Sequence, residues 1–132
     1  MIEEVPNIRV EPIQRPDPAL VAALRDTATG FIVDALGGSG ALDYRIKPAI
    51  ADQWGFCGVA ITCDCGPADN LALVNTLKVL QNGDVIVAAT AQYHQCAVTG
   101  DLVLGMARNA GAIGLVTDGC VRDLLGLRAL GL

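Results

Sequence analysis

The sequence predicts a layered α/β fold in which a largely parallel sheet is flanked by helices. Two observations predict this fold. From residue 58 onward, short apolar runs alternate with helix-like segments, and such alternation is typical of crossover connections between parallel strands. Hydrophobic residues make up 52% of the 132 residues and aromatic residues only 4%, so aliphatic side chains must build the core. The length predicts a single domain, residues 1–132.

The first part of the chain predicts an extended arm followed by two short helices. Prolines are frequent up to residue 18, and they predict an extended arm over residues 1–18. Asp17-Pro18 is typical of an N-cap followed by proline at the first helical position, so a helix is expected over 19–27. A second helix is expected over 31–36, where a glycine pair ends it.

The rest of the chain predicts three strands, each followed by a helix. The strands are apolar and partly β-branched, and the helices show apolar residues at helical spacing or glycine stop signals. Strands are expected at 58–63, 84–89 and 113–117, and helices at 68–80, at 100–109 and from 121 onward.

Two loops follow strands of this sheet, at 90–101 and at 118–123. In open parallel sheets, ligands bind beyond the carboxyl ends of the strands. The carboxyl ends of parallel strands meet at one edge of the sheet, so the two loops are expected to open on the same edge. This edge is the predicted place of the functional site.

Composition argues against several classes of protein. The formal net charge is −5, from 9 basic and 14 acidic residues, and the basic residues form no cluster that could bind a phosphate backbone. The N-terminus lacks the basic and apolar regions of a secretory leader. The longest uncharged stretch is too short and too polar to span a bilayer. We therefore expect no nucleic-acid partner, no membrane partner and a cytoplasmic location, with the five cysteines as reduced thiols.

The second loop carries the densest group of charges. Asp118, Arg122 and Asp123 lie within six residues at a strand-to-helix junction. One interpretation is structural, with Asp118 as the N-cap of the following helix. That interpretation leaves Arg122 in the first turn, where the helix dipole disfavours a cation, and a bound anion would reverse this disadvantage. Spacing alone leaves both interpretations open.

The first loop ends at a predicted helix N-terminus. Gly100 precedes Asp101, and a glycine at this place leaves the first backbone N–H groups unobstructed. Free N–H groups at a helix start can bind a carboxylate or a phosphate. Many helices begin this way, so the pattern alone is weak evidence for a ligand site. The evidence is stronger because both loops are expected at the same edge of the sheet.

These residues carry a resemblance to a known family. The run from Gly100 to Asp123 resembles the signature of the regulator-of-ribonuclease-activity-A-like superfamily, which includes 4-hydroxy-4-methyl-2-oxoglutarate aldolase/oxaloacetate decarboxylase. Supporting matches lie at 29–36, 55–62 and 82–87, and the resemblance extends from about residue 20 to the end. The matching positions of the main run are Gly100-Asp101-Leu102, Ala107-Arg108, Gly111, Gly114, Val116, Asp118-Gly119 and Val121-Arg122-Asp123.

The resemblance implies a fold and an assembly. It implies a swivelling β/β/α-like fold, of which residues 19–132 form the N-terminal part. Family members continue well beyond the helix after Asp123, and this chain ends on an apolar segment at Leu132. We therefore expect the fold to be incomplete at its C-terminus. The resemblance also implies homotrimers or hexamers with the sites at subunit contacts.

The resemblance implies roles for the residues of both loops. Asp123 would be the direct ligand of Mg²⁺ or Mn²⁺, and Asp101 would meet this ion through water. A 2-oxo acid would bind through its carboxylate to backbone N–H groups near Leu102 and Val103, next to Gly100. Arg122 would hold the carbonyl oxygen as it becomes an enolate. Mg²⁺ commonly takes one or two carboxylates and completes its shell with water and substrate.

The implied activity is that of a class II, metal-dependent pyruvate aldolase. It would cleave the C3–C4 bond of 4-hydroxy-2-oxo diacids to pyruvate and decarboxylate oxaloacetate. The metal and Arg122 would stabilise the developing oxyanion, and a metal-organised water would act as the base for an aldol substrate. The motif contains no lysine for an imine route. Which hydroxy-oxo acid is the substrate stays open.

Two other functions remain as alternatives. The first is a non-catalytic regulator that binds an RNA-degrading enzyme; such regulators typically lack the acid that this chain keeps as Asp123. The second is a demethylmenaquinone methyltransferase, because some relatives resemble proteins that carry this name. Nothing in the sequence resembles a binding site for a nucleoside methyl donor.

Several other residues favour structural interpretations. Cys63 and Cys65 could chelate zinc, but a closed site needs four ligands, so they are expected to be buried or partly buried thiols. Cys120 is expected to pack in its loop, and His94 to be a loop residue near the site rather than an acid or base. Trp54 and Phe56 are expected at a layer edge or an interface.

Overall fold

The computed structural model describes residues 8–52 and 55–132. Its centre is a parallel sheet of β1 (Val59–Asp64), β2 (Asp84–Ala89) and β4 (Ala112–Thr117) in the order β1-β2-β4. The three strands correspond to the three that the sequence predicts, and their parallel pairing confirms the predicted fold class. β2 is buried almost throughout, as expected for the central strand of the sheet.

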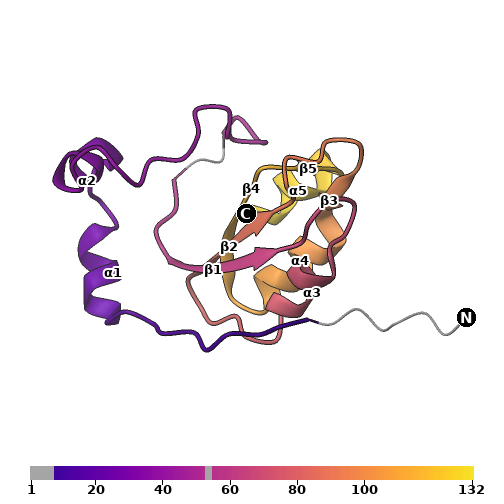
Figure 1. Ribbon diagram of the computed structural model, residues 1–132, viewed down its shortest axis with the longest axis horizontal. Helices are drawn as coiled ribbons and strands as arrows, with labels where there is room; N and C mark the ends of the chain where they lie inside the picture. The colour runs from indigo at the N-terminus through magenta and orange to yellow at the C-terminus, as the bar shows by residue number, and fades with distance from the viewer. Residues whose placement is uncertain (1–7, 53–54) are drawn as a thin grey trace, which may run out of the picture.

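Helices pack against this sheet (Figure 1). α3 (Leu71–Thr76) contacts β1 and β2, α4 (Asp101–Asn109) contacts β4, and α5 (Leu124–Leu130) packs against α4. The core between these elements consists of aliphatic side chains, and Leu73, Ile86 and Ala107 are completely buried. Phe56 packs on the face of β4, where a Cβ at Gly114 would lie 2.9 Å from its ring. Trp54 lies outside the described residues.

A second, smaller sheet was not predicted. β3 (Ala97–Thr99) pairs in parallel with β5 (Cys120–Val121) beyond the ends of β2 and β4. Strands of two or three residues are too short to show a periodic pattern in the sequence. This small sheet connects the two loops that the sequence places at the same edge, and that prediction is confirmed.

After residue 58, two of the predicted helices were wrong in their extent. The helix expected at 68–80 is regular only over α3, because Ala68 has a φ of 58° and the chain after Thr76 continues as turns with i→i+3 hydrogen bonds. The helix expected from residue 121 begins at Leu124, because Cys120–Val121 forms β5. Tertiary pairing overrides the local helix signal at this place.

Two helices near the N-terminus lie apart from the sheet (Figure 1). α1 (Pro18–Leu24) begins as predicted, with the Asp17 carboxylate accepting a hydrogen bond from the Ala19 N–H at 2.8 Å, but ends earlier than residue 27. α2 (Thr29–Ala35) follows. Neither helix buries a residue, and Phe31 is 72% exposed. Of the arm expected over residues 1–18, residues 1–7 lie outside the described part, residues 8–17 run extended without a helix or strand (Figure 1), and Pro18 already belongs to α1.

The extended arm is fixed to the sheet by an ion pair. Arg15 donates hydrogen bonds from both terminal guanidinium nitrogens to Asp84, at 2.5 and 2.8 Å, and one of these nitrogens also reaches the Val79 carbonyl. The Asp84 side chain is only 1% exposed, and it also accepts the Gln81 N–H. Burial alone would raise the pKa of Asp84, but Arg15 and the Gln81 N–H outweigh it and hold the pKa below its ordinary value. Among the described residues, no helix is long and apolar enough to cross a membrane.

Candidate functional site

The start of α4 presents backbone N–H groups beside the small sheet. β3 leads directly into Gly100, whose carbonyl accepts the first helical hydrogen bond, from the Leu104 N–H at 3.2 Å. The N–H groups of Asp101, Leu102 and Val103 therefore have no acceptor within the helix. The predicted helix start is confirmed, and it places these three residues at the carboxyl end of β3.

Arg122 and Asp123 lie against this helix start. The Arg122 N–H donates to the Thr99 carbonyl at 3.1 Å, so β5 is held alongside the strand that leads into Gly100. A Cβ at Gly100 would lie 2.2 Å from the Asp123 carboxylate and 3.0 Å from Arg122 Cγ. Only glycine leaves this space. The structure thus brings together the two parts of the predicted site, which are separated by about twenty residues in sequence.

Asp123 is held in an unusual backbone conformation. Its φ of 63° and ψ of 43° place it in the left-handed region, directly before α5. Aspartate and asparagine tolerate this region better than most residues. Arg122 Nε lies 3.5 Å from the Asp123 carboxylate, and the two side chains are 76% and 45% exposed. Both charged groups are therefore within reach of a small ligand.

Asp101 is the first residue of α4 and contacts α5. A Cβ at Gly126 in α5 would lie 2.0 Å from an Asp101 carboxylate oxygen, so the carboxylate rests against the bare backbone of α5. Gly126 belongs to no motif of the sequence. A glycine inside a helix destabilises that helix by about 1 kcal/mol relative to alanine. Its presence within the predicted helix was therefore the one feature of the sequence that indicated a close approach of another group.

The structural interpretation of Asp118 as a helix N-cap was wrong. Its carboxylate accepts hydrogen bonds from the Thr90 N–H at 2.6 Å, the Thr90 hydroxyl at 2.9 Å and the Gln92 N–H at 2.9 Å. Burial would raise the pKa of Asp118, but these donors outweigh it and lower the pKa. Arg122 precedes α5 and is not in its first turn. The argument that the helix dipole disfavours Arg122 therefore does not apply.

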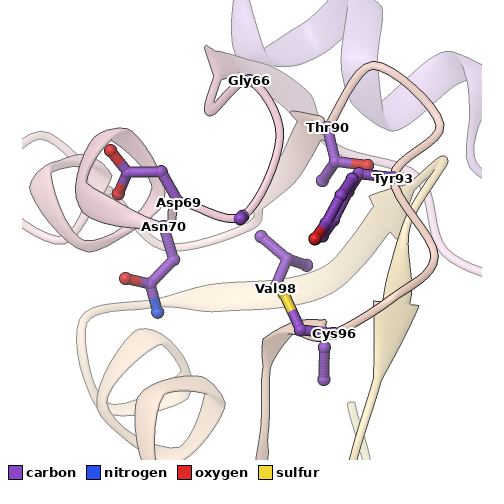
Figure 2. A pocket seen from close by; sticks show the side chains of 9 residues that line it. Gly66, Asp69, Asn70, Thr90, Tyr93, Cys96 and Val98 are labelled. Atoms are coloured by element: carbon purple, nitrogen blue, oxygen red, sulfur yellow. The ribbon is translucent and has the colours of Figure 1, made fainter.

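A small cavity lies beyond the ends of β1 and β2 (Figure 2). Its volume is about 180 Å³. Thr90 and Tyr93 come from the loop after β2, and Asp69 and Asn70 from the segment before α3. Sequence reasoning missed these four residues, because they belong to no motif and come together only in the folded chain.

Three further side chains of the sequence analysis, Cys63, His94 and Cys120, make contacts within the described chain. Cys63 is half-buried, and burial together with the adjacent Cys65 thiol raises its pKa to about 12, so it is a protonated thiol at neutral pH. The ring Nε2 of His94 lies 2.9 Å from the Asp118 carbonyl oxygen. The Cys120 thiol lies 3.9 Å from the His94 carbonyl oxygen.

The carboxylates near the start of α4 are oxygen ligands of the kind that a hard cation prefers, and they would fill only part of its coordination shell. Within residues 8–52 and 55–132, no three His, Cys, Asp or Glu side chains come together to hold a metal ion. A closed four-ligand zinc site does not fit this arrangement. Asp123 and Asp101 each lie in a space left by a glycine, and carboxylate oxygens of this kind are the ligands that Mg²⁺ and Mn²⁺ prefer beside water and substrate.

Comparisons with known proteins agree with this fold and motif. A family model described as RraA-like, Aldolase/RraA, matches residues 22–132. A Halalkalibacterium halodurans protein, provisionally named as a 4-hydroxy-4-methyl-2-oxoglutarate aldolase, is 36% identical over 110 residues, which cover 83% of this chain and 52% of that protein. The chain spans about half the length of the curated relatives it matches over most of its own length.

Solved structures show the same fold. The RNA-processing inhibitor RraA from Thermus thermophilis superimposes with a TM-score of 0.69 at 24% identity, over 81% of this chain and 64% of that one. Streptomyces coelicolor RraAS2, described as an unusual member of the RNase ES inhibitor RraA protein family, gives a TM-score of 0.69 at 27% identity, over 86% and 60% of the two chains. The chain belongs to the RraA-like family of aldolase and RraA proteins.

Proposed function

We propose that this protein is a lyase that depends on a divalent metal, cleaves the C3–C4 bond of 4-hydroxy-2-oxo diacids to pyruvate, and decarboxylates oxaloacetate. The observation that carries the proposal is the position of Arg122 and Asp123 against the N-terminus of α4, in space that Gly100 leaves open. The provisional aldolase name of the relative that is 36% identical supports it.

The side chains have separate tasks in this proposal. Asp123 would hold Mg²⁺ or Mn²⁺ directly, and Asp101 would hold it through water. A bound divalent ion supplies Lewis-acid stabilisation of negative charge. The N–H groups of Leu102 and Val103 would bind the substrate carboxylate at the helix start. Arg122 would donate hydrogen bonds to the 2-oxo oxygen as bond cleavage places negative charge there.

The two reactions differ in their need for a base. Oxaloacetate loses CO₂ as the C3–C4 bond breaks, and the electron pair moves toward the 2-oxo oxygen, so no proton has to be removed first. The resulting enolate then takes a proton from water at C3 to give pyruvate. A 4-hydroxy substrate must also lose its hydroxyl proton. Asp101, a half-buried carboxylate beside the helix start, would hold the water that accepts this proton.

A chelation experiment tests this function. We expect the purified protein with Mg²⁺ to consume oxaloacetate and form pyruvate faster than Mg²⁺ alone. The excess rate should vanish with a chelator and return when Mg²⁺ is restored. A rate equal to that of the metal alone would contradict the proposal and favour the second candidate, a regulator that binds an RNA-degrading enzyme, which the descriptions of the solved relatives suggest.

We also propose that the protein assembles as a homotrimer or hexamer. The two N-terminal helices carry large apolar side chains that have no cover within the described chain, among them Leu20 at 61% and Phe31 at 72% exposure. Such surfaces are typical of contacts with another protein. Sedimentation would measure the number of subunits, and a monomer at micromolar concentration would contradict this proposal.

A further inference from the structure

Asp118 ties the loop after β2 to the loop after β4. Its carboxylate accepts three hydrogen bonds from the first loop: two from Thr90, through N–H and hydroxyl, and one from the Gln92 N–H. A neutral amide could offer only one oxygen to these three donors. The charged form of Asp118 is therefore the form that this arrangement stabilises.

The backbone around Asp118 adds contacts with the same loop. The ring Nε2 of His94 lies 2.9 Å from the Asp118 carbonyl oxygen. Gly119 lies so close to Thr90 that a Cβ would be 2.7 Å from the hydroxyl oxygen. Thr90 itself is only 3% exposed. The two loops thus form one packed unit rather than two independent segments.

This unit is continuous with the proposed site. Two residues after Asp118, the chain enters β5, which pairs with β3. The Arg122 N–H then bonds to Thr99, the residue before Gly100. The hydrogen bonds of Asp118 fix the beginning of the segment 118–123, and they therefore also limit the positions of Arg122 and Asp123. On its other side, Thr90 forms part of the wall of the cavity in Figure 2.

We propose that Asp118 is a positioning residue, which holds Arg122 and Asp123 in register with the N-terminus of α4 by fixing the loop at 90–96. The proposal rests on the proposed function. Asp118 itself would touch neither the metal nor the substrate. Its effect would pass through the Thr90 contacts and the β5–β3 pairing to the two side chains that do.

The experiment compares Asp118→Asn with Asp26→Asn, a control on an exposed aspartate whose side chain forms no hydrogen bond within residues 8–52 and 55–132. We expect the exchange of the Thr90 and Gln92 amide hydrogens to become at least about tenfold faster in Asp118→Asn. We expect the affinity for Mn²⁺ alone and the kcat for oxaloacetate each to fall about tenfold, as is typical when support for a metal ligand is lost. All measurements are made where circular dichroism shows the variants folded.

A second pair of variants keeps the proposal testable if Asp118→Asn does not fold. Thr90→Val removes one hydroxyl donor from Asp118 at nearly constant volume, and Thr90→Ser keeps that donor. Thr90→Val should weaken Mn²⁺ binding about threefold, since one of three hydrogen bonds is lost, and Thr90→Ser should bind Mn²⁺ like the unaltered protein.

The outcomes separate this proposal from the proposed function. Faster amide exchange with unchanged Mn²⁺ affinity and unchanged kcat would overturn the positioning role, because Asp118 would then only stabilise its loop. Weaker Mn²⁺ binding in Asp118→Asn, in a protein that never accelerates oxaloacetate decay, would support the positioning role and contradict the lyase function.

Discussion

An Asp123→Ala variant is expected to lose metal-dependent oxaloacetate decarboxylation by about 10³-fold, or ~4 kcal/mol of transition-state stabilisation. Asp123 is the side chain that would hold the ion directly, and its carboxylate fills the space beside Gly100. Without it, the stabilisation of the developing negative charge is lost together with the ion. Pyruvate formation measured at saturating Mg²⁺ tests this.

The backbone at Asp123 requires a second variant. Its φ of 63° strains an alanine, so a loss of activity in Asp123→Ala could come from a shifted loop. Asparagine tolerates this region and keeps the shape of the side chain but not its charge. Asp123→Asn should therefore lose activity to a similar degree while it remains folded. Activity within threefold of the unaltered protein in Asp123→Asn would refute the metal assignment.

Gly100→Ala probes the same carboxylate without removing it. The added methyl group would lie 2.2 Å from an Asp123 oxygen, so the carboxylate must move. We expect the affinity for Mn²⁺ to fall about tenfold, within the usual range for a displaced metal ligand. Gly105→Ala in the same helix is the matched control, because its methyl group would meet only Leu130 at an ordinary distance of 3.6 Å.

Arg15→Ala is expected to lower the thermal stability of the protein more than substitution of any other ion-paired arginine in the described residues. It leaves the Asp84 carboxylate, which is 1% exposed, without a cationic partner and with the Gln81 N–H as its remaining donor among the described contacts. Removing one partner of a buried ion pair is strongly destabilising, so we expect a fall in Tm of several degrees for a domain of this size. Thermal unfolding followed by circular dichroism at pH 7 measures this loss.

The effect of Arg15→Ala should depend on pH. The pKa of Asp84 is held below its ordinary value in the folded protein, so the pair stabilises the fold above the unfolded value of about 3.9. This contribution is lost as the pH falls through the folded pKa. The difference in Tm between the unaltered protein and the variant should therefore shrink below about pH 4.

The same arm supplies a matched control for Arg15. Arg9 pairs with Glu11, but both side chains are well exposed, at 87% and 65%. Exposed pairs contribute little to stability, so Arg9→Ala should melt within 2 °C of the unaltered protein. An equal Tm for Arg15→Ala would show that the arm is not anchored through Asp84.

Much of the site was predictable from the sequence because its parts are local. Gly100 and Asp101 carry the signals of a helix start, and the structure has that helix begin at Asp101. Alternation of strands and helices predicted parallel strands, whose carboxyl ends meet at one edge. The proximity of Arg122–Asp123 to Gly100 follows from this topology, and the structure confirms it.

The partners of the charged residues were not predictable. Asp118 reads as a helix cap within its own segment, yet it binds a loop that lies 28 residues earlier. Arg15 and Asp84 are 69 residues apart and belong to no shared pattern. Local propensity contains no information on which distant donor a buried carboxylate will meet, because desolvation makes that choice only when the chain is packed.

The sequence by itself thus determined the three parallel strands, the start of α4 and the motif that carries the proposed chemistry. Only the tertiary structure decided where α5 begins, that β3 pairs with β5, and that Gly100 and Gly126 leave room for the Asp123 and Asp101 carboxylates. The physical reason is the separation in sequence between the residues that interact. Helix and strand patterns repeat within a few residues, whereas strand pairing and close approach depend on segments that only the folded core brings together.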